Sequence, residues 1–182
     1  MKKTLSLRPI MHIMRRYEKR HTLVGMEYDE AMRRALELAG QAAAAGDVPV
    51  GAVVLDAAGQ IVGRGYNTRE ADGDPLAHAE IIAMRQAAQA LGAWNLADCT
   101  LAVTLEPCPM CAGAILSARI PRVYYGARDR AMGACGGVLN LFMEDFPARP
   151  ALVGGVLREE CHQVLADFFR SLRGPNGQKR DI

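Results

Sequence analysis

Hydrophobic positions in the first half of the chain change from a helical spacing to a strand spacing. From Asp29 they recur every three or four residues as far as Gly46, which predicts an amphipathic helix. A short apolar run at residues 50–55 predicts a strand, Ala-Ala-Gly at 57–59 predicts a turn, and residues 61–66 return, so together they predict a β-hairpin. The polar stretch 67–75 contains a glycine and a proline and predicts a loop.

The second half of the chain alternates buried strands with helices. Residues 128–148 are rich in glycine and are expected to be irregular. The remaining segments predict, in chain order, a helix over 78–91, a strand over 100–105, a helix over 110–117, strands over 122–126 and 152–157, and a helix over 159–173. Strands that alternate with helices predict an α/β layered domain with a mixed sheet.

Charge is unevenly distributed, although the formal net charge is only +2. Residues 1–25 contain seven Lys or Arg and one acidic residue, whereas the rest of the chain contains fifteen Lys or Arg and nineteen acidic residues. We expect a basic, disordered extension over 1–25, a single folded domain over 26–173 and a polar tail over 174–182. A mildly acidic domain can still bind RNA, because a local basic patch is sufficient to attract phosphates.

The five cysteines do not suggest a disulfide framework, because their number is odd and only two of them are close in sequence. The N-terminal segment lacks the apolar core of a secretory signal, and no apolar run is long enough to span a bilayer. We therefore expect a cytoplasmic protein that does not enter a membrane.

Two short segments carry candidate metal chemistry. One is His-Ala-Glu at 78–80, at the start of a predicted helix, and the other is Pro-Cys-Pro-Met-Cys at 107–111, at a strand-to-helix turn. An isolated Cys-x-x-Cys is more often a redox pair or a structural zinc site. One histidine and two cysteines leave the fourth zinc position for water, which is typical of a catalytic site. We expect one Zn²⁺ per subunit, held by His78, Cys108 and Cys111.

Glu80 is the candidate proton carrier. It is two residues from His78 on a predicted helix, so the two side chains point in different directions and Glu80 is a poor co-ligand. It can nevertheless reach a water at the metal, whose pKa zinc lowers to about 7. We expect Glu80 to take the water proton. In the deamination of a nucleobase, it would then deliver protons to the ring nitrogen of the base and to the departing ammonia. This combination of motifs is the signature of zinc-dependent nucleobase deaminases.

Residues 26–173 resemble the bacterial tRNA adenosine deaminases over nearly their whole length. The matching segments are Val-Pro-Val-Gly-Ala-Val at 48–53, Asp-Pro-Leu-Ala-His-Ala-Glu-Ile at 74–81, Thr-Leu-Glu-Pro-Cys-Pro-Met-Cys-Ala-Gly-Ala at 104–114, Gly-Ala-Arg-Asp at 126–129 and Asp-Phe-Phe-Arg at 167–170. The resemblance implies a three-layer α/β/α fold around a five-stranded mixed sheet and a homodimer. It also implies that the substrate is a tRNA anticodon stem-loop, whose wobble adenosine is converted to inosine.

The resemblance further implies residues that contact the substrate. Asn67 matches a base-contacting asparagine of the family, and its amide can donate to and accept from a purine edge. The backbone of Ala79 is implied as a second base contact. The implied RNA contacts are Arg128, Asp129, Phe169 and Arg170. From the residues alone other roles stay open, namely a turn cap for the asparagine, core packing for the phenylalanine and an internal ion pair for the adjacent Arg and Asp.

Two departures from the family keep alternatives open. The Pro-Met pair between the cysteines and the segment 91–96 resemble guanine deaminases, and the segment 148–152 lacks the Asn-His pair that tRNA adenosine deaminases often have. The alternative function is therefore a guanine or cytosine-type small-molecule deaminase with the same zinc site. A third hypothesis is a zinc-stabilised RNA-binding or scaffold protein without catalysis, in which Glu80 would be dispensable.

Overall fold

The computed structural model describes residues 28–173, so the basic extension expected over 1–25 and the polar tail expected over 174–182 lie outside the described residues. The elements in chain order are α2 (Tyr28–Ala44), β1 (Gly51–Leu55), β2 (Ile61–Tyr66), α3 (Arg69–Asp72), α4 (Ala79–Leu91), β3 (Thr100–Leu105), α5 (Pro109–Ala118), β4 (Arg122–Ala127), the 3-10 helix η1 (Leu141–Met143), β5 (Ala151–Gly154) and α6 (Arg158–Leu172). Within these residues, no helix combines the length and the apolar character needed to cross a membrane.

The strands form one five-stranded mixed sheet with the order β2-β1-β3-β4-β5. β1 pairs antiparallel with β2, as the predicted hairpin requires, and also antiparallel with β3. β3, β4 and β5 are parallel neighbours, and α5 connects β3 to β4. This arrangement confirms the predicted α/β class and the five-stranded mixed sheet.

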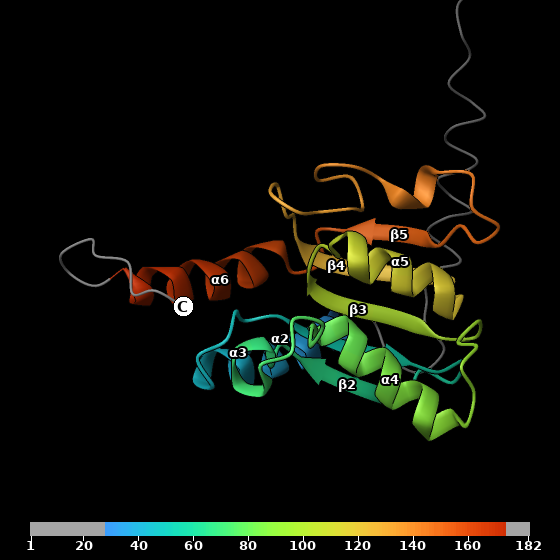
Figure 1. Ribbon diagram of the computed structural model, residues 1–182, viewed down its shortest axis with the longest axis horizontal. Coiled ribbons are helices and arrows are strands. Elements are labelled where there is room, and N and C mark those ends of the chain that lie inside the picture. The colour runs from blue at the N-terminus through green and yellow to red at the C-terminus, as the bar shows by residue number, and fades with distance from the viewer. Residues whose placement is uncertain (1–27, 174–182) are drawn as a thin grey trace, which may run out of the picture.

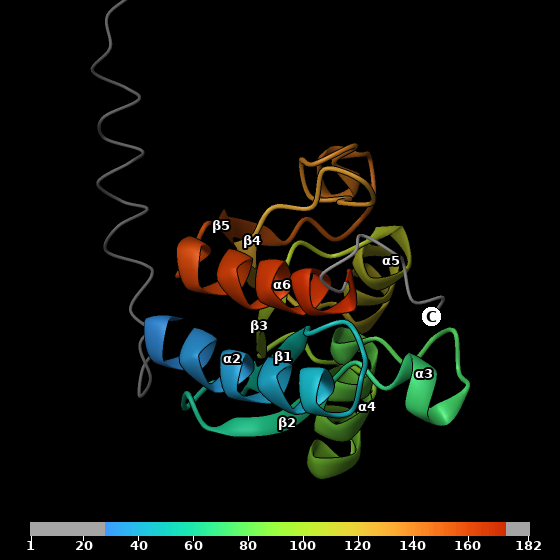
Figure 2. The same ribbon diagram turned by 90° about the vertical axis from the view of Figure 1, so that its left-hand side faces the viewer.

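Helices cover both faces of the sheet and complete three layers. α4 and α5 lie on one face (Figure 1), whereas α2 and α6 lie side by side on the other (Figure 2). Side chains alternate along each strand, and β1 shows this directly. Its Ala52 and Val54 pack into the core with α4 and α5, while Val53 and Leu55 pack into the core with α2 and α6. β1 is therefore buried on both faces, which explains its continuous apolar sequence.

Glycines allow the hairpin to pack closely against α4. A Cβ atom built on Gly65 of β2 would lie 2.2 Å from the Ala79 carbonyl oxygen and 2.6 Å from the Ala83 nitrogen. A Cβ atom on Gly63 would meet the next turn of α4 in the same way, 2.2 Å from the Ala83 carbonyl oxygen. The absence of side chains at these two positions therefore sets the distance of α4, including its N-terminal turn, from the sheet.

Gly65→Ala is expected to lower the stability of the domain by about 1–3 kcal/mol, because the added methyl group overlaps backbone atoms that cannot rotate away. Thermal unfolding of the purified variant measures this effect. Gly40→Ala in the exposed part of α2 is the matched control, because a Cβ there meets nothing within 4 Å and alanine favours a helix by about 0.5–1 kcal/mol. Equal melting temperatures for the two variants would contradict the close packing.

Two details differ from the elements expected from the sequence. The expected strand over 152–157 was too long, because β5 ends at Gly154 and Gly155 takes a left-handed conformation with φ +87°. The N–H groups of Gly155 and Val156 both donate to the Tyr125 carbonyl, so the chain turns there. The expected loop over 67–75 contains the short helix α3, whose first turn donates to the buried carboxylate of Asp47.

Candidate active site

The three candidate metal ligands come from the N-terminal ends of two neighbouring helices. His78 is the residue before α4, and Cys108 is the residue before α5, whose first turn contains Cys111. Pro109 suits the first position of α5, where the N–H that proline lacks would have no partner within the helix. α4 and α5 lie on the same face of the sheet (Figure 1), so the His-Ala-Glu and Pro-Cys-Pro-Met-Cys segments meet there.

The distances between the ligand atoms suit a tetrahedral zinc ion. His78 Nδ1 lies 3.8 Å from Cys108 Sγ and 3.6 Å from Cys111 Sγ, and all three ligand atoms lie within 4.8 Å of one another. Ordinary Zn–N and Zn–S bonds at a tetrahedral angle would separate the nitrogen from each sulfur by about 3.6 Å. The side chains therefore fit zinc as three ligands and leave the fourth position for water or substrate.

Hydrogen bonding within the cluster favours negative charge on one sulfur. The hydrogen bond from Cys111 lowers the pKa of Cys108 to about 4, and His78 adds to this effect against the opposing effect of burial. The pKa of Cys111 is raised, because it interacts with the Cys108 sulfur and is itself buried. The hydrogen bond with Cys108 also raises the pKa of His78. Cys108 is therefore the first cysteine of the cluster to become a thiolate as the pH rises. A negatively charged sulfur favours the binding of a cation.

Glu80 is buried beside this cluster. It lies in the first turn of α4, is only 3% exposed and lines the same cavity as His78 and Cys108. Burial raises the pKa of Glu80 to about 7, and hydrogen bonding to its own backbone opposes the shift. A carboxyl group with a pKa near neutrality can both accept and donate a proton at physiological pH.

The two implied base contacts, Asn67 and Ala79, bind each other in this structure. The Oδ1 atom of Asn67 accepts a hydrogen bond of 2.9 Å from the Ala79 N–H at the start of α4. The asparagine therefore caps the helix that carries Glu80, a role that the His78 side chain does not fill. Asn67 is only 5% exposed, and its Nδ2 group has no protein partner within residues 28–173. That amide N–H₂ is therefore able to donate to a molecule in the cavity.

The cavity next to these residues has a volume of about 340 Å³, which is within the range of small-molecule sites. Its wall also includes residues that the sequence did not predict for the site, among them Arg69, Glu106 and Met132. Glu106 directly precedes the Pro-Cys-x-x-Cys segment. A carboxylate at the end of a buried strand is the sequence feature that could have indicated its place in the site. Arg69 lies in the short helix α3, where the sequence predicted a loop, and Met132 lies in a turn, and the sequence pattern defines the position of neither.

The four candidate RNA contacts lie in two places. Asp129 lines the cavity, and Arg128 donates through Nη2 to the Gly136 carbonyl, so within residues 28–173 no ion pair joins the two. Phe169 and Arg170 lie near the end of α6. The Phe169 side chain is 41% exposed and packs edge-to-face on a neighbouring phenylalanine, and the exposed Arg170 pairs with an aspartate on its own helix.

Comparisons with known proteins identify the family. Residues 26–127 match the family model of the cytidine and deoxycytidylate deaminase zinc-binding region. The chain belongs to this family. The family match and the His-Cys-Cys cluster together confirm the prediction of a zinc site.

Individual relatives extend the similarity beyond the zinc-binding region. The chain is 49% identical over 153 residues to the tRNA-specific adenosine deaminase of Haemophilus influenzae, and the match covers 82% of this chain and 88% of that protein. It is 53% identical over 143 residues, 79% of its length, to the tRNA(Ile)-lysidine synthase of Deinococcus radiodurans, but spans only 25% of that relative.

A solved structure supports the fold. The structure comes from work on A-to-I editing by tRNA:A34 deaminases at the wobble position of transfer RNA, and it superposes with a TM-score of 0.72 at 40% identity. The match covers 75% of this chain and 99% of the other chain. The three-layer fold and the resemblance to tRNA adenosine deaminases inferred from the sequence are therefore confirmed.

Proposed function

We propose that the chain catalyses the hydrolytic deamination of the wobble adenosine of a tRNA anticodon to inosine. The observation that carries the chemistry is the buried carboxyl of Glu80 beside three ligand atoms arranged for a catalytic zinc ion. The similarity to tRNA-specific adenosine deaminases over most of the chain supports the substrate. An anticodon loop presents unstacked bases, which suits a cavity that must enclose one base.

The residues at the site have separate roles in the reaction. Zinc held by His78, Cys108 and Cys111 would supply the Lewis acidity that makes water acidic enough to be deprotonated near pH 7. Glu80 accepts the proton as the water oxygen bonds to C6 of adenine, and it passes that proton to N1. The bond between C6 and the exocyclic nitrogen then breaks, and Glu80 carries the second proton of the water to the departing ammonia.

The amide of Asn67 holds the base in this scheme. Its Oδ1 is occupied by the Ala79 N–H, so the Nδ2 group is the part that donates to an acceptor nitrogen on the purine edge. The bond to Ala79 also fixes the amide orientation before substrate arrives, because only the oxygen of an amide can accept from an N–H group.

Asn67→Asp is expected to raise KM for an adenosine-bearing stem-loop by roughly 5- to 150-fold, which corresponds to one lost hydrogen bond and an unfavourable oxygen in its place. The variant keeps an oxygen acceptor for the Ala79 N–H, so α4 should keep its N-terminal cap and the zinc content should stay close to that of the unmodified protein. Steady-state kinetics measures KM, and metal analysis measures the zinc content. Unchanged KM would show that the amide does not contact the base.

The pH dependence of kcat/KM should report the titration of Glu80. The group must be deprotonated to accept the water proton, and burial raises its pKa above the ordinary value, so the rate constant should fall about tenfold per pH unit on the acid side of this raised pKa and level off above it. Zinc content is measured at each pH, since loss of metal would also lower the rate. A flat profile between pH 5.5 and 8 with zinc retained would contradict this assignment.

The substrate assignment is tested by inosine formation in an adenosine-bearing anticodon stem-loop with zinc-loaded protein. Guanine and cytidine are assayed in parallel for ammonia release. Inosine in the RNA, with no ammonia from the free compounds, would support the proposal. Ammonia from guanine or cytidine without inosine would keep the chemistry but replace the substrate, and no turnover of any compound would favour a non-catalytic RNA-binding or scaffold protein.

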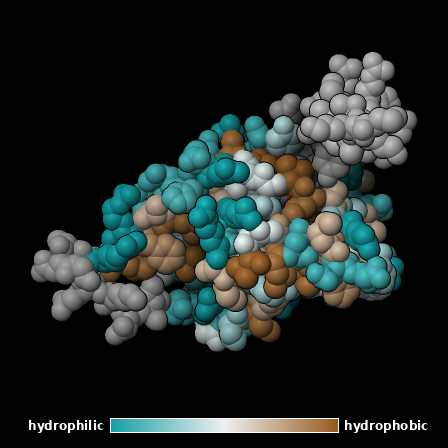
Figure 3. All heavy atoms as spheres, turned by 90° about the horizontal axis from the view of Figure 1, so that it is seen from above, coloured by the Kyte–Doolittle hydropathy of each residue, from teal (hydrophilic) through white to brown (hydrophobic). Residues whose placement is uncertain are grey.

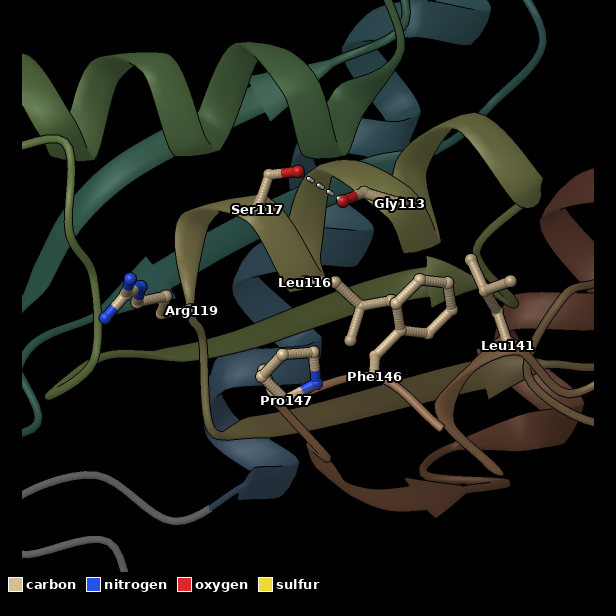
Figure 4. A pocket seen from close by; sticks show the side chains of 8 residues that line it. Gly113, Leu116, Ser117, Arg119, Leu141, Phe146 and Pro147 are labelled. Atoms are coloured by element: carbon tan, nitrogen blue, oxygen red, sulfur yellow. Dashed lines mark hydrogen bonds between the residues drawn. The ribbon is translucent and has the colours of Figure 1, made fainter. Parts of the chain in front are cut away.

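We also propose that two copies of the chain form a homodimer and that the protein is located in the cytoplasm. The structure has an apolar groove of about 630 Å³ between α5 and the segment before β5, where Leu116, Leu141 and Phe146 converge (Figure 4). Nearby, Trp94 is 66% exposed, and the Arg119 guanidinium lies 5.3 Å from the centre of its ring. Figure 3 shows apolar surface on the side of β5 as well. Light scattering at micromolar concentration would distinguish a dimer from a monomer.

A further inference from the structure

A second carboxylate is buried next to the metal-ligand cluster and is not used by the proposed chemistry. Glu106 follows β3, precedes Pro107 and is 2% exposed. Its Oε1 atom accepts backbone hydrogen bonds from Cys135 at 2.9 Å and Gly137 at 2.7 Å, and its Oε2 atom accepts one from Asp129 at 3.1 Å. Three backbone N–H groups of the segment 129–137 therefore converge on one side chain.

Two glycines let this segment surround the carboxylate. A Cβ atom on Gly133 would lie 2.5 Å from the carboxyl carbon of Glu106, and a Cβ atom on Gly137 would lie 2.7 Å from its Oε2. The segment is also tied to the neighbouring backbone, because the Ala134 N–H donates to the Pro107 carbonyl at 2.8 Å. The glycines that suggested an irregular segment thus allow a close approach of backbone to a charged group.

The same segment forms part of the cavity wall. Asp129 and Met132 line the cavity together with Asn67 and Glu80. The Asp129 carboxylate accepts from the N–H groups of Ala131 and Met132, at 2.8 and 3.0 Å, so the turn between these residues is fixed once Asp129 is in place. The Asp129 N–H is one of the three groups held by the buried carboxylate, so the wall depends on that contact.

We propose that Glu106 is a positioning residue that holds the segment 129–137 as one wall of the substrate cavity. The proposal rests on the proposed function, because the wall matters only if the cavity binds the substrate base. Both carboxylate oxygens of Glu106 are occupied by backbone N–H groups, so the residue acts through the segment. Its loss should therefore weaken substrate binding more than it slows the chemical steps, which are performed by Glu80.

Glu106→Gln tests the proposal with little change in volume. An amide offers one acceptor oxygen, so its N–H₂ group must face at least one of the three N–H donors. We expect at least one of the backbone amides of Asp129, Cys135 and Gly137 to exchange hydrogen at least about tenfold faster than in the unmodified protein, because a donor that faces the N–H₂ group loses its acceptor. We expect KM for the stem-loop to rise at least about tenfold, whereas kcat should stay within about threefold of the value for the unmodified protein. The variant should still bind one zinc per chain.

Thr104→Val is the matched control for a general loss of stability. Thr104 is also buried, lies in β3 two residues before Glu106 and accepts the Gly51 N–H at 3.1 Å, and within residues 28–173 its side chain makes no hydrogen bond to the segment. Its loss should lower the melting temperature but leave KM and exchange in the segment unchanged. Gly137→Ala disturbs the same contact from the side of the segment, because the added methyl group would lie 2.7 Å from the Glu106 Oε2 atom. This variant should reproduce the KM increase with the glutamate intact.

The outcomes separate this proposal from the proposed function. Unaltered exchange at the three amides in Glu106→Gln would overturn the positioning role whatever the substrate is, and so would a fall in kcat at unchanged KM. A KM increase of the same size in Thr104→Val would assign the effect to stability and would also overturn it. If the unmodified protein makes no inosine, the proposed function fails, and the exchange experiment still decides whether Glu106 holds the segment.

Discussion

Replacement of Glu80 by glutamine is expected to lower kcat by roughly 10²- to 10⁴-fold, the usual contribution of a positioned acid–base group. Glutamine has nearly the same shape as glutamate but can neither accept the water proton nor deliver it to the base. The effect should be at the upper end of this range, because in the proposed mechanism the same carboxyl group serves every proton transfer.

Zinc content separates this effect from damage to the site. Glu80 is not among the three ligand atoms that lie within 4.8 Å of one another, so Glu80→Gln should retain about one zinc per chain. Glu159→Gln is the control, because Glu159 is exposed in the first turn of α6 and should retain full activity. Full activity in Glu80→Gln would leave the mechanism without its proton carrier. Complete loss of zinc would assign Glu80 to the metal instead.

The layers of the fold follow from local patterns in the sequence. Residues 50–55 are apolar at every position, which is expected of a strand covered on both faces, and β1 is buried at all five positions. The predicted bounds of β2 and β3 agree with the structure because turn-forming residues flank both segments. β5 was misjudged because its apolar run continues past Gly155, where the backbone turns to donate twice to the Tyr125 carbonyl.

The site was predictable only where the chemistry depends on residue type. Imidazole and thiol groups at a fixed spacing indicate a metal whatever the surrounding fold, so the three ligands could be named from the sequence. The contacts of Asn67 and Glu106 are made to backbone N–H groups, and any residue can present such a group. Their partners are 12 to 31 residues away in sequence, so only the folded chain shows which N–H groups each one binds.

Cys111→Ala is expected to lower zinc affinity by more than about 100-fold, since loss of even a hydrogen-bonding partner of a ligand costs 10- to 100-fold. Deamination should be lost with the metal. Unfolding measures the same interaction independently of activity, because an ion that binds only the folded state adds about 4 kcal/mol at 1,000 times its Kd. Added zinc should therefore raise the melting temperature of the chelator-treated unmodified protein, and should not raise that of Cys111→Ala.

Cys135→Ala distinguishes the loss of a ligand from the loss of a buried thiol. Cys135 is 3% exposed and lies in the segment held by Glu106, and it contributes only its backbone N–H to that contact. It does not belong to the ligand cluster, so its alanine variant should keep one zinc per chain and the melting response to zinc. If both variants lost the response equally, burial of thiols would explain the stability. A response lost only in Cys111→Ala means that the metal, held by this sulfur, links the start of α5 to the start of α4.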